Sequence, residues 1–165
     1  MKNLTKLFAV LTLVSFGHVS NAQFHHVFSA NTTIENWGNT IPQSNPGCFS
    51  RYASPHSAYY AYDALADGIK GKGKAIYFPY VNFQGSFDLK IEYTAPSAVS
   101  LWTNFHNGSS WTNGANTSAP ASPGSRSTYT IRSSSLTGTH RFGLFPYNEI
   151  TIHSVTITNV TYSPG

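Results

Sequence analysis

Alternation between apolar and polar residues is the feature that most constrains the fold of this chain. The clearest stretch is Ser86–Thr94, in which apolar and charged residues alternate. The apolar residues are Phe87, Leu89, Ile91 and Tyr93, and the charged residues between them are Asp88, Lys90 and Glu92. Successive side chains of a β-strand point to opposite faces of the sheet, so this pattern predicts a strand with one buried face and one solvated face. The same period recurs around Ser127–Arg132 and in Gly138–Phe145.

Two further segments predict strands with irregularities. Lys74–Val81 is apolar on both faces, and Pro79 within it cannot donate a backbone hydrogen bond, which favours a sheet edge or a bulge. The last strand, Glu149–Tyr162, changes phase along its length, which predicts a β-bulge near His153-Ser154. The alternation changes again at Val160, so two bends in this strand, rather than one bulge, are the alternative.

The remaining segments have weaker patterns. Gln23–Phe28 is expected to be a strand, Asn31–Arg51 is rich in loop-forming residues, and Ser57–Ile69 fits either a short helix or a strand. Asn113–Ser127 is rich in Ser, Ala, Pro and Gly and is expected to be a mobile surface loop, and Ser133–Thr137 is expected to be a turn. Only 10% of the residues are charged, a composition that suits strands better than helices. At least six strands with polar turns predict an all-β fold, an antiparallel β-sandwich that is jelly-roll-like.

The N-terminal residues have the pattern of an export signal. Lys2 and Lys6 give a basic start, Leu7–Phe16 is an apolar run too short to span a bilayer, and small residues end at Ala22. We therefore expect residues 1–22 to be a signal peptide and residues 23–165 to be a single domain; a membrane anchor and a buried first strand are the alternatives. No later segment is long and apolar enough to span a membrane, so the mature chain is expected to be secreted, periplasmic or at the cell surface.

The charge of the chain limits the classes of molecule that it can bind, and its cysteine content limits how the fold is stabilised. Removal of the signal leaves eight basic and six acidic residues, a formal charge of +2, which gives no support for nucleic-acid binding. Lys70, Lys72 and Lys74 are separated by glycines and are expected to lie in a solvated turn. Cys48 is the single cysteine, so the fold must rely on its core rather than on an internal disulfide.

The segment Ser100–Asn113 carries the candidate site. Strand alternation places Leu101, Thr103 and Phe105 on one face, and Trp102, Asn104 and His106 on the other. Trp111 and Asn113 follow in what reads as a loop. Aromatic rings beside amides can hold a sugar, because the ring face attracts polarised C–H groups and the amide both donates and accepts. Packing of Trp102 against a second sheet is the competing interpretation, whereas a tryptophan on a loop is harder to explain by packing.

Catalysis and metal binding have less support. The chain has six acidic residues and no GxSxG or HExxH motif, so we lean against an enzyme. No acidic cluster typical of a calcium site is present. The mature N-terminus, Gln23-Phe24-His25-His26, has the amine, amides and imidazole that can bind Cu(II) in a square plane. The simpler interpretation is that Phe24 and Val27–Phe28 anchor a strand whose histidines face solvent. No cofactor is expected, and calcium and copper remain alternatives.

Four segments together carry a resemblance to a known family: FDLKIEYT at Phe87–Thr94, the strand of Trp102, RFGLF at Arg141–Phe145 and ITIHSVTITNVTY at Ile150–Tyr162. With these segments the chain resembles jelly-roll carbohydrate-binding modules of the galactose-binding-like kind. The resemblance implies sugar binding either on a concave sheet face lined with aromatic residues, where Trp102 fits, or in loops at one end, where Trp111 fits. Many such modules have an acidic residue early in the closing strand, where this chain has His153-Ser154.

These observations lead to one preferred function and two alternatives. We expect an exported, non-catalytic carbohydrate-binding module in which Trp102 and Trp111 stack on sugar rings. The polar residues expected to hydrogen-bond the hydroxyl groups are Asn104, His106, Asn113 and Arg141. The alternatives are a secreted polysaccharide-active enzyme, either a hydrolase or a copper oxygenase, and a structural or adhesion subunit of a surface assembly. The oligomeric state is left open.

Overall fold

The computed structural model describes residues 23–29, 34–37, 49–53, 62–65, 67–71 and 74–162. The predicted signal peptide and Cys48 lie outside these ranges. The described residues form strands and short connections, with no helix among them. They accordingly contain no helix that is long and apolar enough to cross a membrane.

The strands join into one hydrogen-bonded sheet in the order β4-β5-β10-β6-β9-β7-β8, with β1 beside β10, β3 and β11 beside β6, and β2 beside β3. Their bounds are β1 Gln23–Val27, β2 Ile34–Trp37, β3 Phe49–Ala53, β4 Tyr62–Leu65, β5 Gly68–Gly71, β6 Lys74–Ala95, β7 Val99–His106, β8 Trp111–Ala119, β9 Ser122–Pro146, β10 Ile150–Thr158 and β11 Val160–Thr161. Neighbouring strands pair antiparallel except β2 and β3, which are parallel. The predicted all-β, antiparallel, jelly-roll-like sandwich is therefore confirmed.

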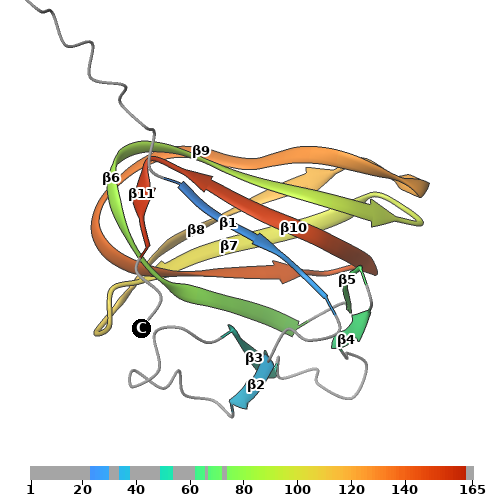
Figure 1. The fold of residues 1–165 in the computed structure, drawn as a ribbon, viewed down its shortest axis with the longest axis horizontal. Helices are drawn as coiled ribbons and strands as arrows, with labels where there is room; N and C mark the ends of the chain where they lie inside the picture. Colours follow the sequence, from blue (N-terminus) through green and yellow to red (C-terminus); the bar gives the residue numbers. More distant parts are fainter. Residues whose placement is uncertain are drawn as a thin grey trace, which may run out of the picture.

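Two long strands fold this sheet over on itself. β6 and β9 pair along most of their length and bend together at the left of Figure 1, so that each contributes to both layers of the sandwich. Near the bend Phe83 pairs with Gly138 and Gly85 pairs with Leu136. Both glycines have positive φ angles, 115° at Gly85 and 87° at Gly138, a conformation that other residues adopt at a cost. One layer combines β1 and β10 with residues 86–95 of β6 and residues 122–135 of β9. The other layer combines β7 and β8 with the first half of β6 and the second half of β9.

The core lies between the two layers and is built from the predicted alternation. Phe87, Leu89, Ile91 and Tyr93 are all at most 3% exposed, as expected, and the charged residues between them reach solvent. Leu101, Thr103 and Phe105 on β7 are likewise buried. The Phe105 ring lies 5.4 Å from Phe83 and 5.6 Å from Phe87, edge to face, and so ties β7 to the bend of β6.

The predicted irregularities are present. The pairing of β6 with β9 shifts register between Tyr77 and Tyr80, which places Pro79 in a bulge. The pairing of β10 with β6 shifts between Ile152 and Ser154, as the change of phase indicated. A second bend occurs at Asn159, whose φ is 54° and which separates β10 from β11.

Four sequence-based expectations are wrong or incomplete. Ser133–Thr137 is not a turn but the middle of β9, and Asn113–Ser127 is not a mobile loop but the body of β8 and the start of β9. In both cases pairing with another strand, β6 for the first segment and mainly β7 for the second, satisfies backbone groups that local composition assigned to a turn or loop. The described part of Ser57–Ile69 is β4 and the start of β5 rather than a helix, and Asn31–Arg51 contributes β2 and part of β3.

Candidate functional site

The outward side of β7 carries the most exposed aromatic surface of its layer. Because Leu101 and Phe105 point into the core, Trp102 points away from it and is 39% exposed. Phe145 on β9 lies directly opposite Trp102 and is half-buried. Tyr147, just after β9, is 49% exposed, and its ring lies 4.8 Å from Phe145 in an edge-to-face arrangement. Trp102, Phe145 and Tyr147 together are called the aromatic face below.

Polar groups border the aromatic face. Asn116 on β8 is exposed and lies opposite Trp102. Its Oδ1 accepts the Ser100 hydroxyl at 3.4 Å, and the Ser100 carbonyl in turn accepts the Tyr147 N–H at 2.9 Å. This chain of bonds holds the turn of Tyr147 against β7. The Asn116 side chain therefore lies next to the exposed indole ring of Trp102, and its amide N–H groups can donate hydrogen bonds to a ligand.

Asn104, two residues along the same face, is instead packed onto the sheet. It is 8% exposed and lies opposite Gly143 on β9, which is itself opposite Tyr77 on β6. A Cβ atom on Gly143 would collide with the Asn104 amide oxygen and would lie 2.6 Å from Tyr77 Cε1. Gly143 is thus required by the close approach of two side chains, which rest on its backbone and connect three strands.

His106 and Arg141 form a buried polar pair at the end of β7. They lie opposite each other in the β7–β9 pairing and are 7% and 0% exposed. Arg141 Nε donates to the Phe78 carbonyl at 2.7 Å, and its guanidinium lies 5.6 Å from the centre of the Tyr80 ring. His106 Nδ1 accepts the Gly108 N–H at 3.1 Å, which requires a neutral ring with its proton on Nε2. Burial first, then the charges of Arg141 and His140, lower the pKa of His106.

The two histidines with shifted pKa predict a pH dependence of stability. Burial, and to a lesser extent His25, lowers the pKa of His26, as burial and Arg141 lower that of His106. The unfolded chain therefore takes up protons at these rings near pH 6.5 while the folded chain does not. The free energy of unfolding should be constant above that pH and fall as the pH decreases towards the folded-state pKa values. Urea unfolding in steps from pH 8 to pH 5 would measure this. A His26→Gln/His106→Gln double variant should lose most of the slope, and an equal slope in the variant would contradict the assignment.

The predicted site residues do not form one group. Trp102 is exposed as the binding hypothesis requires, whereas Asn104, His106 and Arg141 are buried, and Arg141 offers no surface to a ligand. Trp111 is not on a loop: it is the first residue of β8 and lies opposite His106. Asn113 also lies in β8, beside the register shift between Thr103 and Phe105. Phe145 and Tyr147 were missed, although the phase of Arg141–Phe145 places Phe145 on the non-core face.

The N-terminal strand shows a mixed outcome. Phe24 and Phe28 are buried as expected, but Val27 is 58% exposed and His26 is partly buried. His25 is exposed, with Nδ1 2.8 Å from Thr156 Oγ1. Among the residues that the structure describes, no group of three or more His, Cys, Asp or Glu side chains is arranged to hold a metal ion.

Comparison with known proteins yields matches in structure only. No model of a protein family matches the chain, and no curated protein matches it significantly. A β-(1,4)-mannanase from Podospora anserina, described as GH26-CBM35, superposes with a TM-score of 0.50 at 15% identity and covers 87% of this chain. This chain covers 29% of that protein, so the likeness concerns a part of it.

Two solved carbohydrate-binding modules are similar at lower scores. The module CBM6cm-2 of Cellvibrio mixtus lichenase 5A, solved in complex with cellotriose, has a TM-score of 0.48 at 16% identity and covers 61% of this chain. The C-terminal CBM6 of LamC from Zobellia galactanivorans has a TM-score of 0.45 at 16% identity, over 61% of this chain. This chain covers 87% and 88% of those modules. At these identities the likeness to the mannanase concerns the fold.

Proposed function

We propose that this chain is an exported carbohydrate-binding protein without catalytic activity, and that sugar rings stack on the aromatic face. One observation carries the proposal. Among the described residues three large hydrophobic side chains are exposed, and two of them, Trp102 and Tyr147, belong to this face. Exposed aromatic residues that gather on one sheet surface are typical of a binding site, whereas scattered ones are not.

The chemistry of the face suits a sugar. The indole of Trp102 offers a flat apolar surface to the C–H groups of a pyranose ring, and the tyrosine adds a hydroxyl group. Asn116 and Ser100 lie beside it, and their uncharged side chains can both donate hydrogen bonds to the hydroxyl groups of a sugar and accept hydrogen bonds from them. The shared fold with a mannanase that contains a CBM35 module supports the same class of function.

The remaining predicted residues take different roles in this proposal. Asn104, His106 and Arg141 are buried, so we assign them to shaping the sheet beneath the ligand rather than to touching it. Trp111 and Asn113 on β8 remain candidates for contact at the opposite end of β7 from Trp102.

The four acidic side chains that the structure describes support binding rather than hydrolysis. Asp67 and Glu92 both lie within 3.5 Å of Arg126, Asp88 lies 3.4 Å from Lys90, and Glu149 lies 3.0 Å from Lys70. A glycosidase needs two carboxyl groups that face each other across a cleft. The proposal of a non-catalytic protein rests on these pairings.

Substitution of Trp102 tests the proposal. A glycan array would identify ligands, and titration calorimetry with a bound oligosaccharide would measure affinity. Trp102→Ala should weaken binding by roughly 2 kcal/mol, about thirtyfold, because truncation of a central aromatic contact is costly. Val27→Ala is a matched control, because Val27 is also an exposed hydrophobic residue but lies on β1, in the other layer. Unchanged glycan binding by both Trp102→Ala and Trp111→Ala would reject the proposal.

A further inference from the structure

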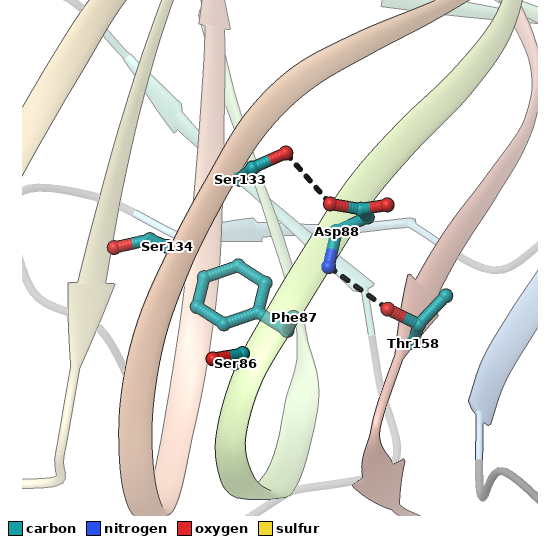
Figure 2. Close-up of a pocket in the computed structure, with 6 residues that line it drawn as sticks. All are labelled: Ser86, Phe87, Asp88, Ser133, Ser134 and Thr158. Carbon is teal, nitrogen blue, oxygen red and sulfur yellow. Dashed lines mark hydrogen bonds between the residues drawn. The ribbon is translucent and has the colours of Figure 1, made fainter.

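A depression lies apart from the aromatic face, where β6, β9 and β10 meet beside the bend. Its volume is about 480 Å³, and its lining consists of Ser86, Phe87, Asp88, Ser133, Ser134 and Thr158 (Figure 2). Four of these six residues carry a hydroxyl group and one carries a carboxyl group. Trp102 belongs to β7, in the other layer, so the two surfaces are separate.

Hydrogen bonds fix the polar groups of this depression. Ser133 Oγ donates to Asp88 Oδ1 at 2.6 Å, and the backbone N–H of Asp88 donates to Thr158 Oγ1 at 2.8 Å (Figure 2). Lys90 Nζ lies 3.4 Å from Asp88 Oδ2. The hydrogen bond from Ser133 and then the contact with Lys90 lower the pKa of Asp88, so the carboxylate stays ionised. Ser133 on β9 and Lys90 on β6 thereby hold the carboxylate in place, and Thr158 on β10 holds the backbone beside it.

The charges around Asp88 decide which ligand fits. An ionised carboxylate only accepts hydrogen bonds, and its side chain is 41% exposed, so it is available to hydroxyl donors. Lys90 already lies against the other carboxylate oxygen, so a cationic ligand would meet a charge of its own sign. A neutral polyol meets no such repulsion, and the serine hydroxyl groups can both donate to it and accept from it.

We propose that this depression is a second ligand site that takes one sugar ring or a similar neutral polyol. Asp88 accepts hydrogen bonds from two neighbouring hydroxyl groups of the ligand, and Ser86 and Ser133, which lie on the same face of the sheet as Asp88, complete the contacts. The volume is within the range of pockets of about 300 to 1,000 Å³ that hold small molecules. The site does not depend on the aromatic face, so it can exist whether or not that face binds glycans.

Amide chemical shifts of the mature chain, titrated with methyl glycosides, test this site. The probes are methyl glucoside, methyl mannoside and methyl galactoside, with ethylammonium chloride as a cationic comparison. At least one glycoside should shift the amide signals of Asp88, Ser134 and Thr158, with a dissociation constant in roughly the millimolar range, because an open site for one small ring is weak. The same signals should respond less to ethylammonium.

Variants separate this site from its surroundings. Asp88→Asn keeps the shape and should weaken binding about tenfold or more, because it removes a charged acceptor. Ser86 is exposed, so Ser86→Phe should block the depression without disturbing the core. Glu149→Gln is the matched control, because Glu149 is an exposed carboxylate paired with a lysine elsewhere, and it should bind as the wild type does.

Four results would overturn the inference: no shift at these amides with any glycoside, a stronger response to ethylammonium, equal affinity in Asp88→Asn, or equal affinity in Ser86→Phe. Trp102→Ala should leave the shifts at Asp88 unchanged. Failure of this second site is therefore distinguishable from failure of the aromatic face.

Discussion

Replacement of Gly143 by alanine should lower the free energy of unfolding by roughly 3 kcal/mol and the melting temperature by about 10 °C. The added methyl group would enter the space of the Asn104 amide oxygen and the Tyr77 ring. Both side chains are at most 8% exposed, so neither can move aside without disturbing its packing. Three strands would have to separate locally to admit one carbon atom. Chemical unfolding of the purified variant measures the loss.

Two further variants isolate the steric cause. In Gly143→Ala/Asn104→Ala the closest collision is removed, so part of the lost stability should return, and the two substitutions should be strongly non-additive. Gly124→Ala is a control at a site where a Cβ meets nothing within 4 Å; its φ of 71° should cost only about 1 kcal/mol. A Gly143→Ala protein as stable as the wild type would show that Asn104 and Tyr77 move aside without cost.

Removal of the Arg141 side chain should have a comparably large effect on stability. Arg141→Ala deletes the donor that binds the Phe78 carbonyl at 2.7 Å, next to the bulge at Pro79, and leaves a buried cavity under Tyr80. A lost buried hydrogen bond and a cavity of this kind together cost about 3 kcal/mol or more. Arg141→Lys keeps the positive charge but has no N–H at the position of Nε, so it should recover only a part. Thermal unfolding of the two variants measures the difference.

The same variants decide between two roles for Arg141. If the residue is structural, as its complete burial indicates, Arg141→Lys should bind glycans with an affinity within about twofold of the wild type wherever it is folded. A large loss of affinity in a variant of unchanged stability would instead return Arg141 to the ligand contacts predicted from the sequence.

Strand faces could be predicted because they depend on local periodicity. The alternation in β6 places four apolar side chains on the same face of the strand, so all four are buried together whichever strand pairs with it. These residues are Phe87, Leu89, Ile91 and Tyr93. The bulges at Pro79 and His153-Ser154 could also be located, because a proline or a change of phase marks the position directly. These features need no knowledge of the partner strand.

The length of the strands could not be predicted in this way. Ser133–Thr137 and Asn113–Ser127 have the composition of turns and loops, yet the first pairs with β6, far away in the sequence, and much of the second pairs with β7 or β6. Gly85 and Gly138 bend two strands that continue through them, whereas the sequence pattern predicts separate strands that begin at Ser86 and at Gly138. Tertiary pairing outweighed local preference at each of these positions.

The candidate site was predicted only in part, for a related reason. Phase placed Trp102, Asn104 and His106 on one side of β7, but exposure depends on what packs above that side, and only Trp102 is open. Phe145 joins the site because of the register between β7 and β9, which no single segment encodes. Tyr147 joins the site because the turn after β9 is held against β7 by the hydrogen bond from the Tyr147 N–H to the Ser100 carbonyl.

The ribbon formed by β6 and β9 also has a consequence for how the chain folds. Its pairings run from Ala95 with Ser122 to Ile76 with Leu144, so each successive hydrogen bond closes a longer loop of chain. Such non-local order slows the search for the native state, and sandwiches of this kind typically fold in milliseconds to seconds. The half of the ribbon next to Ala95 and Ser122 closes the shorter loop, so we expect it to pair first. The half next to Ile76 and Leu144 closes the longer loop, so we expect the layer that contains β7 and β8 to be completed later.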